Sequence, residues 1–123
     1  MHNVFPPDST AQPEVSFDAF LQIDIRVGTV IEAVPYPQAR KPSYRMRVDF
    51  GPGVGIKKSC AQLTELYDPE DLVGRQVAGV VNFPPRQIGK AISETLILGF
   101  PDDDGRIVLF RPDVAVPNGA RLV

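Results

Sequence analysis

Apolar and polar residues alternate with a period of two along several short stretches of this 123-residue chain. In residues 44–51 (YRMRVDFG), apolar side chains occupy the even positions and charged side chains the odd ones, which predicts a β-strand with one buried face. Residues 24–34 alternate in the same way, with Gly28 in the middle, where we expect a bulge or a strong bend. Short runs between turn residues predict further strands at residues 56–63, 75–83, 94–100 and 107–110.

Few segments have the spacing of a helix. Ser16 is placed to cap a short helix over residues 16–23, whose apolar face we expect to pack on a sheet. Residues 64–74 predict one or two helical turns. Residues 1–15 mix proline, serine, threonine and acids without periodicity, and they predict a flexible N-terminal arm.

These elements together predict an all-β domain. Five or six short strands with regularly spaced turns are typical of small barrels and sandwiches. A helical insertion between the third and fourth strands favours a five-stranded, partly open Greek-key barrel of the oligonucleotide/oligosaccharide-binding (OB) type. Thirteen prolines disfavour further helix. We therefore expect one domain over residues 16–123, with short helical segments and N- and C-terminal extensions.

The net charge of −2 conceals an uneven distribution of charged residues. Residues 1–25 carry four acids and no base, residues 26–90 carry ten bases and six acids, and residues 91–123 carry three bases and five acids. The positive middle of the chain is suited to attract phosphate or acidic segments. A mixture of charges on solvated faces is the alternative explanation of the same counts.

Residues that build the common catalytic sites are scarce. The single histidine, His2, is predicted to be solvated at a frayed end, and the single cysteine, Cys60, is predicted to be a small core residue. One cysteine excludes an intrachain disulfide and a cysteine cluster for zinc. Residues 102–105 (DDDG) predict an acidic turn instead of a calcium loop. We expect a binding protein that is not an enzyme and that needs neither a metal nor a cofactor.

Two further absences concern localisation. The chain has no signal peptide pattern, and no stretch approaches the ~20 apolar residues that a membrane helix needs. Together with the single cysteine, these observations favour a cytoplasmic protein without membrane insertion.

The stretch between the fourth and fifth predicted strands is unusual. Residues 80–100 read VVNFPPRQIGKAISETLILGF, and a tight hairpin turn needs far fewer residues than this stretch supplies. We expect an exposed lip that is apolar at Phe-Pro-Pro and basic at Arg86 and Lys90, because a basic loop beside an apolar wall has no obvious packing role.

The order of these motifs resembles the CsaA family, small bacterial proteins described as export-related chaperones and built on a tRNA-binding domain that some aminoacyl-tRNA synthetases share. The motifs are DIRVG, SCAQL, NFPPRQI with Ser93-Glu94 downstream, and PNG, and the resemblance covers roughly residues 17–123. It implies an OB-type barrel, a homodimer held largely by its terminal segments, and two kinds of ligand: tRNA and unfolded or exported polypeptide.

Two departures from general tRNA-binding domains favour the chaperone branch. Tyr36 and Arg40 stand where such domains usually carry a histidine and an aspartate. The stretch Phe83-Pro84-Pro85 makes the loop more apolar than the general pattern.

Two hypotheses about function follow. In the first, a homodimeric chaperone acts without ATP on unfolded or exported polypeptides in protein secretion, with Phe-Pro-Pro and Ile88 as an apolar floor. In the second, the basic surface around the barrel binds tRNA. The candidate residues for either ligand are Asn82, Phe83, Pro84, Pro85, Arg86, Lys90, Ser93, Lys57, Lys58, Arg40 and Lys41.

Structural roles compete with these assignments. The Asn82 amide is suited to tie down the loop, Ser93 to cap a turn, and Phe83 to fill the barrel core. Arg45 and Arg47 fit the solvated face of a half-buried strand. The apolar tail that ends the chain can pack on its own barrel instead of on a second copy.

Overall fold

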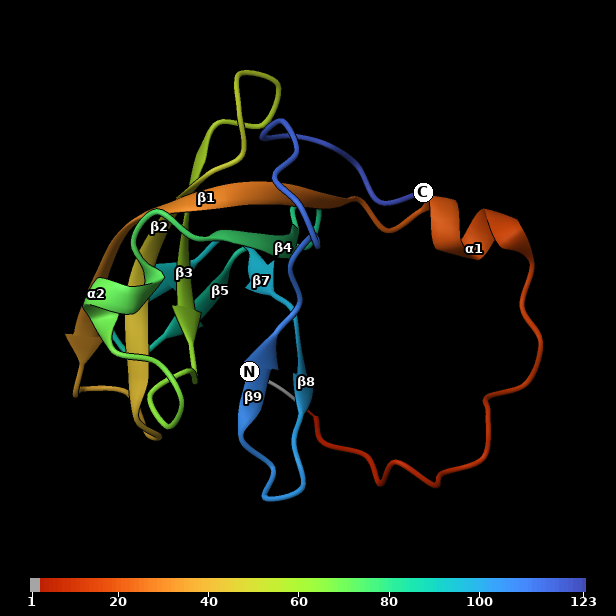
Figure 1. Ribbon diagram of the computed structural model, residues 1–123, viewed down its shortest axis with the longest axis horizontal. Helices are drawn as coiled ribbons and strands as arrows, with labels where there is room; N and C mark the ends of the chain where they lie inside the picture. Colours follow the sequence, from red (N-terminus) through yellow and green to blue (C-terminus); the bar gives the residue numbers. More distant parts are fainter. Residues whose placement is uncertain (1–2) are drawn as a thin grey trace.

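A curled antiparallel sheet forms the body of the protein. In the computed structural model, which describes residues 3–123, five strands pair in the order β3-β2-β1-β4-β7 (Figure 1). They are β1 (Ile25–Tyr36), β2 (Ser43–Asp49), β3 (Ile56–Ala61), β4 (Gln76–Val80) and β7 (Leu96–Ile97). The predicted five-stranded, OB-type fold is confirmed. The prediction for His2 lies outside the described residues.

The sheet curls until β3 meets the chain that enters β7. The Glu94 N–H donates to the Lys58 carbonyl (2.7 Å), and the Glu94 carboxylate accepts the Lys58 N–H (2.9 Å). Beside them, the Cys60 N–H donates to Ser93 Oγ (3.2 Å). We call this contact the seam. Side chains replace part of the backbone ladder here, so the barrel is only partly closed.

Strand β2 has the burial that its alternating sequence predicts. Met46, Val48 and the following Phe50 are almost completely buried, whereas Arg45 and Arg47 are exposed. The solvated-face interpretation of the two arginines is therefore confirmed.

Gly28 is important for packing, and the bulge that we expected there lies elsewhere. A Cβ at Gly28 would lie 2.8 Å from Phe50 Cδ1 and 2.9 Å from the Asp49 carbonyl oxygen. The register shift of β1 falls between Val30 and Glu32, so of the two alternatives at Gly28, a bulge or a strong bend, the bulge is wrong. A larger residue does not fit at Gly28, because the Val48 and Phe50 side chains and the Asp49 carbonyl oxygen occupy that space.

The two helices differ in what they cover. Helix α2 (Pro69–Leu72) buries Leu72 completely in the core. Helix α1 (Phe17–Leu21) stands away from the barrel, with 68% of Phe17 and 47% of Leu21 exposed (Figure 1). The prediction that its apolar face packs on the sheet is wrong, because the pattern identifies an apolar face without specifying what covers it. No helix among the described residues is long and apolar enough to cross a membrane.

The expected exposed lip is built as a small hairpin. Strands β5 (Arg86–Ile88) and β6 (Ala91–Ser93) pair with each other outside the main sheet. The Tyr36 hydroxyl donates to the Ile88 carbonyl (2.8 Å) and accepts the Lys90 N–H (3.0 Å), which fixes the hairpin tip to the end of β1.

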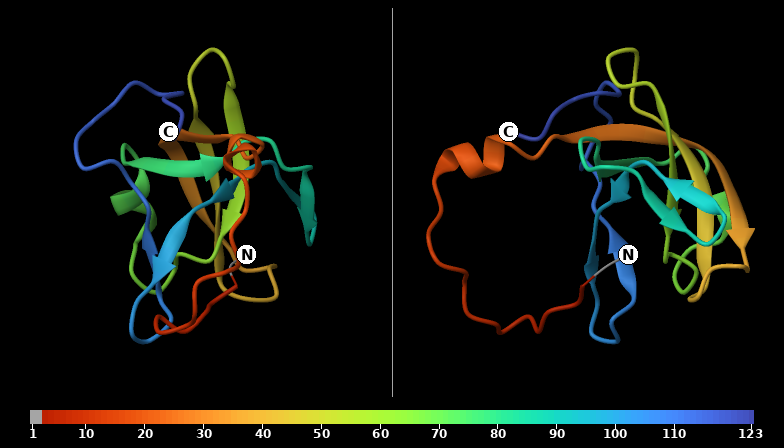
Figure 2. Two further views of the ribbon diagram at one scale, coloured as in Figure 1. Left: turned by 90° about the vertical axis from the view of Figure 1, so that its right-hand side faces the viewer. Right: turned by 180° about the vertical axis from the view of Figure 1, so that it is seen from behind.

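The predicted fifth strand divides at Leu98. Its first part is β7 in the main sheet, and its second part is β8 (Gly99–Pro101), which pairs with β9 (Ile107–Leu109). The chain then returns along β1, where the Gly119 N–H donates to the Val27 carbonyl (2.8 Å) and the Leu122 N–H to the Ile25 carbonyl (2.8 Å). The apolar tail therefore packs on its own barrel, and the C-terminus lies beside α1 (Figures 1 and 2).

Candidate functional site

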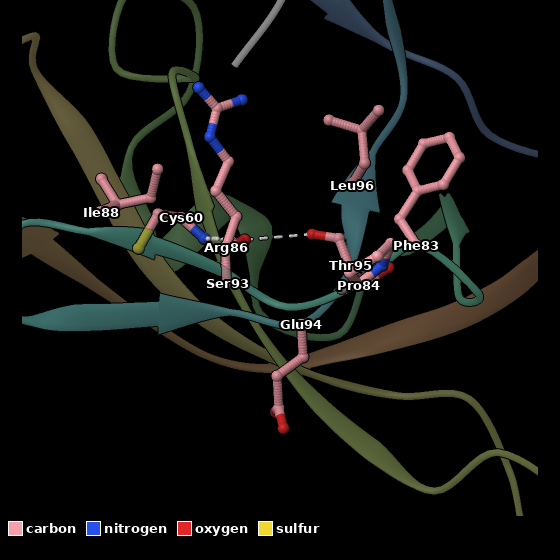
Figure 3. A pocket seen from close by; sticks show the side chains of 9 residues that line it. All are labelled: Cys60, Phe83, Pro84, Arg86, Ile88, Ser93, Glu94, Thr95 and Leu96. Carbon is pink, nitrogen blue, oxygen red and sulfur yellow. Dashed lines mark hydrogen bonds between the residues drawn. The ribbon is translucent and has the colours of Figure 1, made fainter.

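A hollow of about 240 Å³ lies between the β5–β6 hairpin and the start of β7. We call it the apolar pocket. It is lined by Cys60, Phe83, Pro84, Arg86, Ile88, Ser93, Glu94, Thr95 and Leu96 (Figure 3). Its volume suits one or two side chains of a larger partner better than a whole small molecule, whose pockets usually measure about 300–1,000 Å³.

The side chains around this pocket have a clear orientation. Those of Phe83, Arg86 and Leu96 extend toward the same side, whereas the Glu94 side chain points the opposite way (Figure 3). The Glu94 carboxylate is engaged at the seam by a backbone N–H. The pocket therefore combines an apolar wall with a guanidinium group.

Ser93 belongs to the framework of the pocket. Its Oγ accepts the Cys60 N–H and donates to the Thr95 carbonyl, each at 3.2 Å (Figure 3). The hydroxyl thus joins β3 to the turn before β7, as the turn-capping alternative anticipated. It also lines the pocket.

A second hollow of about 280 Å³ lies on the other side of Cys60, and we call it the basic groove. Its lining carries four cationic side chains and one acid, namely Arg45, Arg47, Lys58, Lys90 and Glu32. One long ion pair, of 3.8 Å from Arg47 Nη1 to Glu32 Oε2, offsets part of this charge. The cations come from β2, β3 and the hairpin, so the fold gathers charges that are distant in the sequence.

Cys60 separates the two hollows and lines both. Its side chain is partly exposed, so the prediction of a small core residue is wrong. Burial raises the pKa of the thiol, and the nearby Arg45 charge opposes that shift only in part. The thiol is therefore protonated at neutral pH and weakly nucleophilic.

The structure brings together six of the predicted site residues in these two hollows. The apolar pocket receives Phe83, Pro84, Arg86 and Ser93, and the basic groove receives Lys58 and Lys90. Phe83 remains 43% exposed, so its alternative assignment to the barrel core is wrong.

The other five predicted residues, Asn82 among them, lie outside both linings. Pro85 is exposed beside the pocket. Lys57 alternates with Lys58 along β3 and therefore points to the opposite face of the strand. Arg40 and Lys41 lie in the β1–β2 loop, where Arg40 lines a separate shallow hollow that is rich in proline and tyrosine.

Asn82 has a structural role. Its Oδ1 accepts the Asp24 N–H (2.9 Å), and its Nδ2 donates to the Gln22 carbonyl (2.8 Å). The amide therefore ties the segment before β1 to the loop that follows β4. The alternative that Asn82 holds a loop in place is supported, although the segment it holds is the N-terminal connection.

Sequence reasoning missed two residues that the site needs. Leu96 forms part of the pocket wall, and Tyr36 positions the hairpin. The sequence contained a signal for Cys60, because its even position in β3 places it on the same face as Lys58. Among residues 3–123, no group of three or more His, Cys, Asp or Glu side chains is arranged to hold a metal ion.

Comparison with known proteins gives a family for this architecture. Residues 25–121 match the family described as putative tRNA binding domain. The chain belongs to this family. The match includes the whole five-stranded sheet and both hollows, and the family is defined by a binding function.

Solved structures extend the likeness to nearly the whole chain. Chaperone CsaA from Bacillus anthracis has a TM-score of 0.85 and 42% identity, over 90% of this chain and 100% of that one. The CsaA chaperone protein from Picrophilus torridus has a TM-score of 0.83 and 39% identity, over 89% and 100%. The resemblance to CsaA proteins that the motifs predicted is thereby confirmed.

Curated relatives include larger proteins. A methionine–tRNA ligase from Porphyromonas gingivalis is 38% identical over 109 residues, which are 89% of this chain and 16% of that protein. One from Parabacteroides distasonis is 35% identical over 88% of this chain and 16% of its own length. This chain thus spans about one-sixth of the length of these ligases.

Proposed function

We propose that this chain is a CsaA-like chaperone that holds segments of unfolded or exported polypeptide in its apolar pocket. The observation that carries the proposal is the pocket wall, in which Phe83, Pro84 and Leu96 surround a hollow that suits one or two side chains. Proline is already rigid, so this wall loses little entropy when a ligand binds. The 42% identity to a CsaA chaperone over the whole of that chain supports the same conclusion.

The proposed activity is passive holding in the cytoplasm, without ATP, cofactor or catalytic step. The sequence contains no phosphate-loop motif. Arg86 at the pocket attracts acidic groups or backbone carbonyls of the client, and the apolar wall takes up its hydrophobic side chains.

We further propose that the working form is a homodimer that uses the terminal segments. Arg121 Nη2 donates to the Leu21 carbonyl (2.7 Å), which places the chain end beside α1. Phe17 and Leu21 on the helix and Leu122 and Val123 at the chain end expose apolar side chains together on this side. A second copy that covered them would place two pockets on one particle, and two weak sites gain avidity for a long unfolded chain.

Titration of a fluorescently labelled, permanently unfolded polypeptide tests the pocket. Phe83→Ala is expected to weaken binding about fivefold, because a half-exposed ring contributes roughly 1 kcal/mol when it becomes buried. Phe100→Ala is the matched control, since Phe100 is also exposed but lies outside the pocket, on β8. Equal affinity of Phe83→Ala and the wild type would exclude this pocket as the peptide site.

Sedimentation at micromolar concentration tests the dimer. We expect a dimer for the wild type and a monomer for Phe17→Glu, because a charge in an apolar interface is costly to bury. Phe100→Glu is the control and should remain dimeric. A monomeric wild type would remove the paired-site mechanism.

The basic groove supports tRNA binding as a second candidate function. Four cations surround one hollow, and the family is described as a tRNA binding domain. Arg45, Arg47, Lys58 and Lys90 would contact phosphates, and such binding weakens by nearly one power of salt concentration for each phosphate contacted.

A tRNA mobility-shift assay at low and moderate salt tests this second function. Lys58→Gln should weaken binding and lower its salt dependence, whereas Lys57→Gln should do neither, because Lys57 points away from the groove. Absence of binding at low salt would leave only the polypeptide function.

A further inference from the structure

The described part of the N-terminal arm, residues 3–15, carries apolar side chains that remain largely exposed. Every one of these residues is exposed, and Phe5 retains 69% of its accessible surface. The arm leaves α1 as a wide loop that curves back toward the barrel (Figures 1 and 2). Phe5-Pro6-Pro7 is followed by Asp8, and the arm contains a second acid, Glu14, and no base. It therefore has the character of an acidic, proline-containing peptide with one aromatic side chain.

The two hollows have the complementary character. The triplet Phe-Pro-Pro occurs a second time at residues 83–85, where it is followed by the base Arg86. The pocket wall is apolar, Arg86 lines it, and the basic groove begins on the far side of Cys60. The Glu94 carboxylate, which would repel an acidic segment, points away and is engaged at the seam (Figure 3).

The segment that joins the arm and α1 to β1, residues 22–24, is fixed at the rim of this pocket, and we call it the root of the arm. Asn82 holds Gln22 and Asp24 through two hydrogen bonds and directly precedes Phe83. The nine residues from Asp8 to Ser16 span up to about 30 Å when extended, and α1 adds only a short rigid segment. The arm is therefore long enough to fold back from its root to the pocket.

Pro6 and Pro7 determine how such a segment can bind. Proline has no N–H to donate, so these residues cannot extend a sheet by regular strand pairing. Rigid proline segments are instead recognised by their side chains in apolar or aromatic-lined hollows. The apolar pocket is a hollow of that kind beside the root of the arm.

We propose that the apolar pocket binds segments with the pattern aromatic-proline-proline-acid, and that residues 5–8 of the same chain are its built-in competitor. This inference rests on the proposed polypeptide-binding function and adds the substrate class and the regulation of that site. In the docked state, which differs from the exposed arm of the structure, the Phe5 ring packs against Phe83 and Leu96, and Asp8 pairs with Arg86. A client polypeptide must displace the arm before it binds.

The test uses a labelled free peptide with the sequence of residues 3–15, titrated into the full-length chain. The variant with Phe5→Ala and Asp8→Asn cannot dock its own arm, so it should bind the free peptide about two- to tenfold more tightly than the wild type, given an effective arm concentration on the order of millimolar. The control variant, Glu14→Gln with Val15→Ala, alters the other end of the arm and should behave as the wild type. Equal affinity for all three proteins, or no binding to the first variant, would overturn the inference.

Two further measurements identify the site and the chain that supplies the arm. Adding Phe83→Ala to the first variant should remove its binding of the peptide, and unchanged binding would place the peptide elsewhere. Amide chemical shifts of Cys60, Ser93 and Thr95 should differ between the wild type and the first variant, by amounts that do not depend on protein concentration. A difference that grows with concentration would mean that the arm comes from a second copy, contrary to the proposal.

The outcome can be separated from that of the proposed function. The unfolded polypeptide is titrated into the same proteins in parallel. If it binds while the arm peptide does not, the inference fails alone. If the arm peptide binds with the expected pattern while the unfolded polypeptide binds none of the proteins, the proposed chaperone function is wrong. The proposal that residues 5–8 occupy the apolar pocket is then still supported.

Discussion

Removal of the Tyr36 hydroxyl should release the hairpin that contributes to both hollows of the candidate site. Tyr36→Phe keeps the ring, which is almost completely buried, and deletes only the oxygen. That oxygen makes two hydrogen bonds to backbone groups of the hairpin, at Ile88 and Lys90. Each such bond contributes about 1 kcal/mol net, and an unsatisfied buried partner raises the cost, so the free energy of unfolding should fall by about 1–3 kcal/mol.

Two assays measure this effect. Urea unfolding gives the change in stability from the shift in midpoint at constant slope. Hydrogen exchange gives the local effect, since the Lys90 amide loses the hydroxyl that accepts its hydrogen bond and should exchange faster. Peptide binding should weaken in parallel, because Arg86, Ile88 and Ser93 all reach the apolar pocket from this hairpin.

Tyr44→Phe is the matched control. The Tyr44 hydroxyl is equally buried and donates one hydrogen bond, to the Tyr67 carbonyl (2.7 Å), away from the hairpin. It should cost about half as much stability and leave the exchange of the Lys90 amide unchanged. If Tyr36→Phe changed neither the unfolding midpoint nor that exchange rate, the hydroxyl could not be what holds the hairpin.

Three further predictions follow from packing and from perturbed pKa values. Gly28→Ala should lower stability in urea by about 2–3 kcal/mol through overpacking, whereas Gly53→Ala, whose Cβ would meet nothing within 4 Å, should change it by less than about 0.5 kcal/mol; similar losses for both would refute the close-packing argument. Burial raises the pKa of Cys60, so alkylation by iodoacetamide should have its pH midpoint above that of a free cysteine. The stability that the protonated thiol provides should be lost as pH rises through its folded-state pKa. An alkylation midpoint below that of a free cysteine would contradict this. At Asp102, burial acts to raise the pKa, but hydrogen bonds from Arg106 prevail and lower it. The stability difference between wild type and Asp102→Ala should therefore be present at neutral pH and vanish as pH falls through the folded-state pKa. A difference that persisted in acid would show that the charge is not responsible.

The alternating strands were predictable because their physical cause is local. In β2 one face meets the core and the other meets water, so a period of two fixes both the element and its buried residues. The hairpin strands β5 and β6 have three residues each and follow two prolines, and a run of that length has no reliable period. The hairpin is held by Tyr36, which is about fifty residues away in the sequence. The sequence of the loop alone could therefore not predict the hairpin.

The candidate site was predictable as a region but not residue by residue. Phe83 and Arg86 stood out because their loop was longer than its turn required, and they line the pocket. Lys57 and Lys58 were both assigned to the site, although alternation in the predicted strand already places them on opposite faces. The apolar face of α1 was recognisable in the sequence. Whether another part of the protein packs on that face depends on long-range contacts that a local pattern does not encode.

Cys60 lines both hollows and the same hairpin contributes to each, so we expect occupancy of one hollow to affect binding in the other. The hairpin contributes Ile88 and Ser93 to the apolar pocket and Lys90 to the basic groove, so a displacement that widens one hollow alters the other. If an occupant of the groove weakens the affinity of the pocket by some factor, an occupant of the pocket weakens the affinity of the groove by the same factor. If the protein binds both polypeptide and RNA, we expect it to exchange one for the other instead of holding both at full strength, and the abundance of each ligand would then decide which of them the barrel carries.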